Sequence, residues 1–164
     1  MNRKLILFLM VPLILVSARF ADAQQAIFFV RHAEQSVETE DPELTEVGKK
    51  RAKALASVLK DAGINVIYTT ERKRAIQTAE PIAKSLNIET KRLPLRDLDG
   101  LIGRLRTQHA QDRVLVVSHS LALPRLLKAL GHPVEVTIAL DEYDNLFVLV
   151  PKNEGSPMVL RLRY

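Results

Sequence analysis

Two short apolar runs without a single polar residue constrain the fold of this 164-residue chain more than any other feature. The runs are Ala26-Ile27-Phe28-Phe29-Val30 and Val114-Leu115-Val116-Val117. A strand with one face in water alternates polar and apolar residues, whereas a strand covered on both faces is apolar throughout. Both runs therefore predict strands at the centre of a sheet that carries helices on both of its faces.

The rest of the chain repeats apolar residues with helical spacing, interrupted by further short strands. Apolar residues recur at steps of three and four in the helical segments. The last two apolar segments flank a turn-rich stretch at 152–157, which indicates a hairpin. The segments expected to be helical are 45–62, 75–86, 99–110 and 121–130, and the further strands are 64–68, 88–93, 146–150 and 158–162. This order predicts an α/β fold: a three-layer sandwich with a mainly parallel central sheet, helices on both faces and an antiparallel C-terminal edge hairpin.

The N-terminal segment differs in character from the rest of the chain. Arg3 and Lys4 precede an apolar stretch at 5–16, and a small-x-small end at Ala21 and Ala23 follows it. A basic start, a short apolar core and a small-residue end are typical of a secretory signal peptide. We therefore predict cleavage after Ala23.

A retained membrane anchor is the alternative interpretation of this segment. A spanning helix needs roughly 20 apolar residues, whereas the run here has 12 and Pro12 interrupts it. We therefore expect residues 1–23 to be a removed signal peptide, with no stable membrane insertion after cleavage. Residues 24–164 are then expected to form a single domain that is periplasmic or secreted, with its oligomeric state left open.

Charge and cysteine content exclude several classes of protein. Removal of residues 1–23 takes away three basic residues and one acidic residue, which lowers the formal net charge from +5 to +3. No run of Lys and Arg marks a nucleic-acid-binding surface. The chain has no Cys, which excludes a disulfide scaffold and a thiolate zinc site. We predict no metal site and no cofactor, because two candidate histidines fall short of the three or four ligands of a zinc site.

Three polar clusters directly follow candidate strands. They are Arg31-His32-Ala33-Glu34, Thr70-Glu71-Arg72-Lys73-Arg74 and Ser118-His119-Ser120. Ligands of such sheets bind beyond the carboxyl ends of the strands, near helix N-termini. Guanidinium and imidazole groups that converge there repel one another and attract an anion, and the arginine fork matches phosphate oxygens. The clusters therefore predict an anion site, with phosphate as the preferred ligand.

Two histidines in a phosphate site suggest covalent catalysis. A neutral imidazole is a good nucleophile toward phosphorus, and a covalent intermediate splits one difficult displacement into two easier steps. A second imidazole can donate to the phosphoryl oxygens as charge shifts in the transition state. An acid that protonates the leaving oxygen completes the requirement. His109 and His132 are expected to be satisfied surface residues without a role in catalysis.

Four motifs, in this order, resemble those of the histidine phosphatase superfamily, the phosphoglycerate mutase-like clan. The opening Arg-His-Gly motif corresponds to residues 31–33, and the Leu-Thr-Glu-x-Gly element to residues 44–48. The second arginine motif, Arg-x-x-x-Thr-Ala, corresponds to residues 74–79, and the second histidine motif to residues 116–120. The resemblance covers about residues 26–164 and implies the same α/β fold.

The resemblance also implies a role for individual residues. His32 would be the nucleophile that carries the phosphoryl group, and Arg31, Arg74 and His119 would complete the phosphate pocket. Ala33 stands where the family has glycine. Its methyl group lies where backbone would otherwise approach the ligand closely.

The general acid is the open part of this assignment. The family usually places an acidic residue between the second arginine motif and the second histidine motif, and Asp97 and Asp99 lie in that interval. Asp97 is the first choice because it is nearer to the preceding strand, although either residue can be a helix cap instead. Glu34 and Glu71 are next in line.

These expectations combine into a function. The chain is expected to be an exported phosphomonoester hydrolase that acts through a phosphohistidine intermediate on His32. A small-molecule phosphate, such as a sugar phosphate, or a phosphate on a surface glycan is the expected substrate. The alternative is a module of the same fold that binds a phosphorylated ligand but lacks a working acid and does not turn it over.

Overall fold

The computed structural model describes residues 25–37 and 39–164, so the predicted signal peptide lies outside the described residues. A six-stranded sheet in the order β3-β2-β4-β1-β5-β6 forms the centre of the fold. The strands are β1 (Ala26–Arg31), β2 (Val66–Thr70), β3 (Thr90–Leu93), β4 (Arg113–Ser118), β5 (Asn145–Val150) and β6 (Met158–Arg163). Within this part of the chain, no helix combines the length and the hydropathy that crossing a membrane requires.

The sheet is parallel over four strands and antiparallel over the last two. β1 pairs with β4 in parallel, β4 with β2, and β2 with β3. β5 runs antiparallel to β1, and β6 antiparallel to β5, as the C-terminal hairpin requires. The fold predicted from the apolar runs is therefore confirmed. The two runs pair directly with each other, Ile27 opposite Val114 and Val30 opposite Val117.

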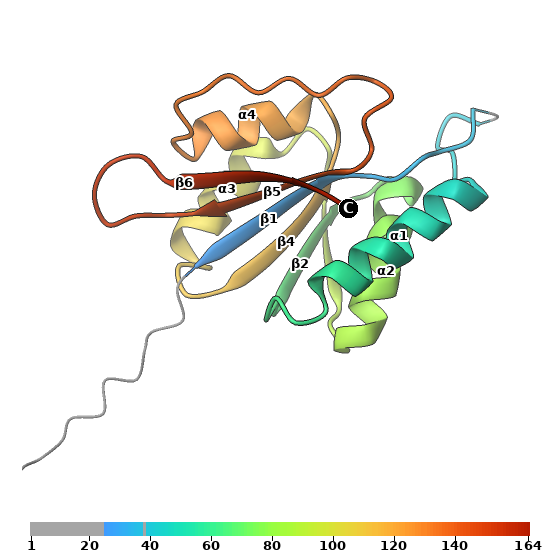
Figure 1. Ribbon diagram of the computed structural model, residues 1–164, viewed down its shortest axis with the longest axis horizontal. Helices are drawn as coiled ribbons and strands as arrows, with labels where there is room; N and C mark the ends of the chain where they lie inside the picture. Colours follow the sequence, from blue (N-terminus) through green and yellow to red (C-terminus); the bar gives the residue numbers. More distant parts are fainter. Residues whose placement is uncertain (1–24, 38) are drawn as a thin grey trace, which may run out of the picture.

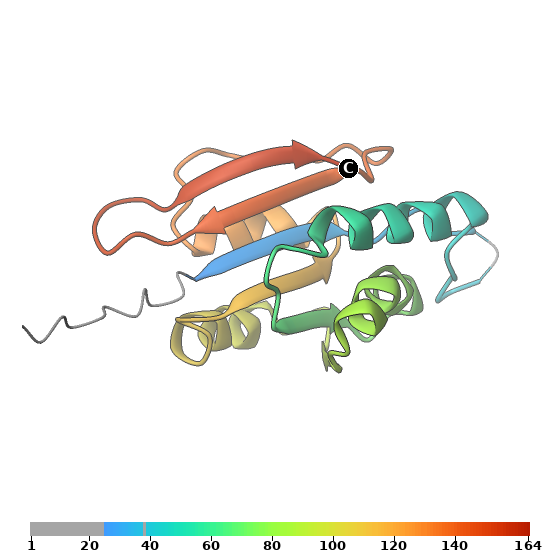
Figure 2. The same ribbon diagram turned by 60° about the horizontal axis from the view of Figure 1, so that its bottom comes forward.

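Two helices cover each face of the sheet (Figures 1 and 2). Helices α1 and α2 pack side by side on one face, and α3 and α4 lie on the other. Their bounds are α1 (Glu46–Leu59), α2 (Lys73–Leu86), α3 (Leu98–Thr107) and α4 (Ala122–Ala129). Pro81 lies inside α2, and the helix continues through it as one element.

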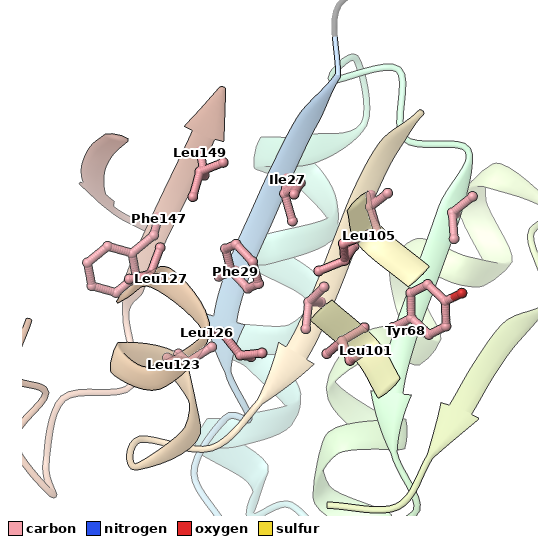
Figure 3. Close-up of a cluster of buried hydrophobic side chains, with 13 residues drawn as sticks. Ile27, Phe29, Tyr68, Leu101, Leu105, Leu123, Leu126, Leu127, Phe147 and Leu149 are labelled. Atoms are coloured by element: carbon pink, nitrogen blue, oxygen red, sulfur yellow. The ribbon is translucent and has the colours of Figure 1, made fainter. Parts of the chain in front are cut away.

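The larger core lies between the sheet and helices α3 and α4 (Figure 3). Phe29 and Phe147 from neighbouring strands are almost completely buried there, against Leu123, Leu126 and Leu127 of α4. A second core under α1 and α2 is built around Leu55 and Ile82. Burial on both faces explains why the central strands contain no polar alternation.

Candidate active site

The carboxyl ends of β1, β4 and β2 bring the three polar clusters to one edge of the sheet. Arg31 is the register partner of Ser118, and the backbone N–H of His32 donates to the Ser118 carbonyl at 2.9 Å. His119 follows directly after β4, and Thr70 ends β2 on the other side of it. Pairing of the strands thus places His32 and His119 next to each other, as expected for parallel neighbours.

The imidazole of His32 is buried and held in one tautomer. Its Nδ1 lies 2.8 Å from the carbonyl oxygen of Ala33, and a carbonyl can only accept a hydrogen bond. Nδ1 therefore carries the proton, and Nε2 presents its lone pair. The side chain lines a cavity, although only 4% of the residue is exposed. This is the geometry that an imidazole nucleophile needs.

His119 faces His32 across the site. The ring centroids are 5.1 Å apart, with an interplanar angle of 61°. A guanidinium can only donate, so Nη2 of Arg74 donates to Nδ1 of His119, at 3.4 Å. Nε2–H of His119 then donates to Thr70 Oγ1 at 3.0 Å. Arg74 and Thr70 together fix the orientation of the second imidazole.

Both imidazoles are uncharged at neutral pH. Burial lowers the pKa of His32 from 6.5 to about 4, and the guanidiniums of Arg74 and Arg31 add to this effect against the hydrogen bond to Ala33. Burial, followed by repulsion from His32 and the arginines, lowers the pKa of His119 to about 3. A neutral His32 keeps its Nε2 lone pair free.

Arg74 lies in the first turn of α2 and points toward the imidazoles. Its side chain is 15% exposed, and Nη1 is 3.7 Å from Oδ1 of Asp41. Burial lowers the pKa of this guanidinium, while Asp41 opposes the shift. The group stays charged in proteins under all ordinary conditions. Of the guanidiniums near the site, it contributes most to lowering the pKa of both histidines.

Arg31 is oriented differently from the expectation. Its Nη1 donates to the carbonyl oxygens of Ala139, Leu140 and Glu142, at 3.2, 2.8 and 3.1 Å, and its guanidinium stacks over the Tyr143 ring at 3.9 Å. The side chain is not among those that line the cavity. Arg31 thus ties the loop before β5 to the site, and its contact with a bound phosphoryl group stays a prediction.

The loop that carries His32 is held from two sides. Thr78 of α2, which is fully buried, accepts from the backbone N–H of Ala33 at 2.9 Å. Arg51 of α1 forms a bidentate ion pair with Glu34, whose pKa falls below its usual value because the Arg51 contact outweighs burial. Ala33 itself packs against apolar side chains of the loop and α1, so its methyl group is accommodated away from the cavity.

Helix α1 approaches this loop closely at Gly48. A Cβ atom there would lie 2.2 Å from the carbonyl oxygen of Glu34, a distance that no side chain can adopt without movement of the backbone. The side chain of Thr45, the N-cap of α1, accepts from Gly48 N–H, and the backbone N–H of Thr45 donates to the Glu34 carbonyl. The Leu-Thr-Glu-x-Gly element therefore fastens α1 to the loop after His32.

The histidines open into a cavity of about 470 Å³. Its walls come from the ends of β1 and β4, the start of α2, the segment before α3 and the start of α4. The lining residues are His32, Gln35, Arg74, Leu95, Arg96, Leu98, His119, Ser120, Leu121, Ala122 and Arg125. Among the residues that the structure describes, three arginines and two histidines line it and no carboxylate does, which makes the cavity suited to an anion.

The candidate acids lie beside this cavity rather than in its wall. Asp97 is the N-cap of α3, and its carboxylate accepts from Gly100 N–H at 3.0 Å. Asp99 is exposed in the first turn of the same helix. Glu71 accepts from the backbone N–H of Leu95 at 2.7 Å. Asp97 lies between two lining residues, Arg96 and Leu98, and its role as general acid stays a prediction.

His109 lies outside the site. It is buried, which corrects its expected surface position, and both ring nitrogens have hydrogen-bond partners: Tyr68 OH is 2.8 Å from Nε2, and Asp112 Oδ2 is 2.7 Å from Nδ1.

Several contacts of the site itself could not be predicted from the sequence. In the sequence, Thr70 stands out only as part of a polar cluster, and Arg125 carries no signal because its position depends on how α4 packs against the sheet.

A family model matches the part of the chain that carries His32 and Arg74. Residues 27–102 match the model of the histidine phosphatase superfamily (branch 1). This match confirms the resemblance for the motifs at 31–33, 44–48 and 74–79, and it covers less than half of the chain. The matched segment contains His32 and Arg74, and His119 lies after its end.

One curated relative and several solved structures are similar to this chain. Phosphoserine phosphatase 1 of Hydrogenobacter thermophilus is 40% identical over 70 residues, which cover 38% of this chain and 33% of the relative. The match therefore spans about a third of that protein's length.

The structural neighbours extend the similarity to the whole fold. The protein histidine phosphatase SixA, solved in complex with tungstate, covers 84% of this chain and 96% of its own, with 21% identity and a TM-score of 0.71. The alpha-ribazole phosphatase of Shigella flexneri has 16% identity, a TM-score of 0.68, and coverage of 84% and 96%. A phosphoserine phosphatase of Entamoeba histolytica, solved with 3-phosphoglyceric acid, has 16% identity, a TM-score of 0.66, and coverage of 85% and 97%.

Proposed function

We propose that this chain is a phosphomonoester hydrolase that works through a phosphohistidine on His32. The observation that carries the proposal is the arrangement of His32: a neutral imidazole with its Nε2 lone pair free, facing His119 and Arg74 in a cavity lined by cations. The named relatives, all phosphatases, support the reaction class.

The reaction follows from these groups in two steps. In the first, Nε2 of His32 forms a bond to phosphorus while the bond from phosphorus to the ester oxygen breaks, and that oxygen takes up a proton. In the second, a water oxygen attacks phosphorus, the N–P bond breaks, and inorganic phosphate leaves with the imidazole neutral again. Arg74 balances the phosphoryl charge throughout. A bound anion also offsets the positive charges that disfavour protonation of His119. Its Nδ1 can then be protonated and donate to a phosphoryl oxygen.

Asp97 is the proposed donor of the proton to the leaving oxygen. Its carboxylate must leave the N-cap of α3 to reach an ester that occupies the cavity. A substrate with a good leaving group needs no such donor, so the dependence on Asp97 is expected to grow as the leaving group becomes more basic.

The substrate is proposed to be a small phosphate ester, such as a sugar phosphate, or a phosphorylated surface glycan. Export supports the second source: the N-terminal 23 residues have the pattern of a cleaved signal peptide. N-terminal sequencing and intact mass of the protein recovered from the producing cells test this directly. A mature chain that begins at Gln24 is expected, and a chain that retains residues 1–23 would contradict export by cleavage.

Substitution of His32 tests the proposed reaction. We expect His32→Ala to abolish phosphate release from an aryl phosphate and to abolish the acid-labile phosphoenzyme that the unaltered protein forms. His132→Ala, which changes a histidine outside the cavity, is the matched control and is expected to keep both. Retained turnover in His32→Ala would overturn the nucleophile assignment.

A phosphate-binding module is the second candidate, and the observation that favours it is that no carboxylate lines the cavity among residues 25–37 and 39–164. Two measurements on the unaltered protein distinguish the hydrolase from the binding module: a titration with inorganic phosphate and an assay of phosphate release from esters. Tight phosphate binding without release from any ester would identify the binding module. Turnover of aryl phosphates would identify the enzyme.

A further inference from the structure

The cavity continues beyond the groups that the proposed reaction uses. Its deep part holds His32, His119 and Arg74, which are all largely buried. Its outer part holds Arg96, in the segment before α3, and Arg125, on α4, and both of these residues are exposed. One transferable phosphoryl group fills the deep part, so the two outer guanidiniums are left for another part of the substrate.

In the described part of the chain, neither of the two outer arginines is held in an ion pair, although Arg125 also lines a neighbouring hollow that contains Glu135. Among the residues that the structure describes, neither forms a salt bridge with a carboxylate. The carboxylates nearest in sequence to Arg96 are Asp97, which accepts from Gly100 N–H at the start of α3, and Asp99, and neither of them lines the cavity. Glu71 is bound to the backbone of Leu95 and lies 3.9 Å from Arg72.

Apolar side chains line the same cavity as the deep and the outer cations. Leu95 and Leu98 flank Arg96 in sequence, and Leu121 lines the cavity from the start of α4. Leu121 is 83% exposed, an unusual position for a leucine beside an active site. A ligand that spans the cavity would cover this apolar surface, which is favourable in proportion to the area removed from water.

We propose that Arg96 and Arg125 form a second anion-binding subsite. The inference rests on the proposed function and deepens it: the preferred substrates are phosphate esters whose leaving group has an apolar body and a second anionic group, either a carboxylate or another phosphate. Guanidiniums suit both groups because their planar fork matches paired oxygens. The phosphoryl group to be transferred binds at His32, and the second anion at the cavity mouth.

Matched aryl esters test the subsite. The substrates are para-carboxyphenyl phosphate and its neutral analogue para-carbamoylphenyl phosphate, with a phenylene bisphosphate to distinguish a second phosphate from a carboxylate. We expect kcat/KM to be higher for the anionic ester than for the neutral one. We expect Arg96→Gln or Arg125→Gln to lower kcat/KM for the anionic ester roughly tenfold, the effect of one lost charge-assisted hydrogen bond, and to lower it far less for the neutral ester.

Controls separate this subsite from a general effect of charge. Arg92→Gln on β3 and Lys128→Gln on α4 remove the same charge from nearby exposed positions that do not line the cavity, and both are expected to leave the anionic preference intact. An equal loss for anionic and neutral esters in Arg96→Gln and Arg125→Gln would overturn the proposal. An absence of preference in the unaltered protein would do the same.

A binding measurement keeps the subsite and the reaction apart. Calorimetric titration with para-carboxyphenylphosphonate and para-carbamoylphenylphosphonate, which cannot be hydrolysed, does not depend on turnover. Tighter binding of the first compound that is lost in Arg125→Gln would support the subsite even if no ester were hydrolysed, in which case only the proposed reaction would fail. Equal binding of both, beside normal turnover, would overturn the subsite alone.

Discussion

At the scale of single residues, the hydrogen bond between His119 and Thr70 is the contact that most directly orients the second imidazole. We expect Thr70→Val to lower kcat on an aryl phosphate by about tenfold, because one charge-assisted hydrogen bond in the transition state is worth about 1.5–3 kcal/mol. Thr69→Val is the matched control: Thr69 Oγ1 is buried without a hydrogen-bond partner among the described residues, so its removal should leave activity and stability unchanged or improved. Equal losses in both variants would contradict the role of Thr70.

The low pKa values of the two histidines give a second prediction at this scale. In the free protein, proton NMR should show both imidazoles neutral at pH 6, with the pKa of His32 near 4 and that of His119 near 3. Saturation with inorganic phosphate should raise the pKa of His119, because the anion offsets the repulsion from Arg74 and His32. His119→Gln supplies the assignment of the signals. Titration of both residues near pH 6.5 in the free protein would show that the two imidazoles are not buried as described.

At the scale of elements, the contact between α1 and the loop after His32 depends on one glycine. We expect Gly48→Ala to destabilise the protein by about 1–3 kcal/mol, the usual cost of overpacking, and to lower activity, because the added methyl group displaces the Glu34 carbonyl. Gly103→Ala in α3 is the control, since a Cβ there meets nothing within 4 Å. It should stabilise the protein by roughly 0.5–1 kcal/mol. Urea unfolding measures both.

Helix α3 carries the test of the general acid. Asn is as good an N-cap as Asp, so Asp97→Asn is expected to keep the stability of α3, whereas Asp97→Ala should cost about 0.5–2 kcal/mol. As general acid, Asp97 should be needed for an alkyl phosphate and not for an activated aryl phosphate, with a loss of roughly 10²-fold or more in Asp97→Asn on the alkyl ester. Asp99→Asn, assayed beside it, is expected to be silent. If both esters react normally in Asp97→Asn, the residue is a cap and the acid lies elsewhere.

The elements also explain which parts of the site could be predicted from the sequence. His32 and His119 follow the two apolar runs, and pairing of buried parallel strands leaves them no other place than one sheet edge. The orientation of Arg31 was not predictable, since its carbonyl partners lie more than 100 residues away in a loop without a sequence pattern. The same holds for Arg125, because the face that α4 turns to the cavity depends on tertiary packing.

At the scale of the whole molecule, burial of two neutral imidazoles makes folding sensitive to acid. In the unfolded chain each titrates near 6.5, and in the folded protein near 4 for His32 and 3 for His119. Between these values the unfolded state binds more protons, so the free energy of unfolding falls as pH falls below 6.5. The loss should approach about 1.4 kcal/mol per pH unit for each imidazole at most.

Between pH 6.5 and about 4.5, the histidines are expected to change the free energy of unfolding while the carboxylates do not. Glu34, Asp112 and Glu142 have lowered pKa values, so their contribution to stability is lost only at more acidic pH, as they become protonated in the folded protein. Urea unfolding at pH 7, 6 and 5 should therefore show a steep decline in the unaltered protein and a much flatter one in the double variant His32→Gln/His119→Gln. Two imidazoles that are buried and neutral in the folded protein must make the free energy of unfolding depend on pH in this way. If the free energy of unfolding changed equally with pH in the two proteins, the imidazoles would be hydrated. His32 would then lack the buried environment on which its proposed role as nucleophile depends.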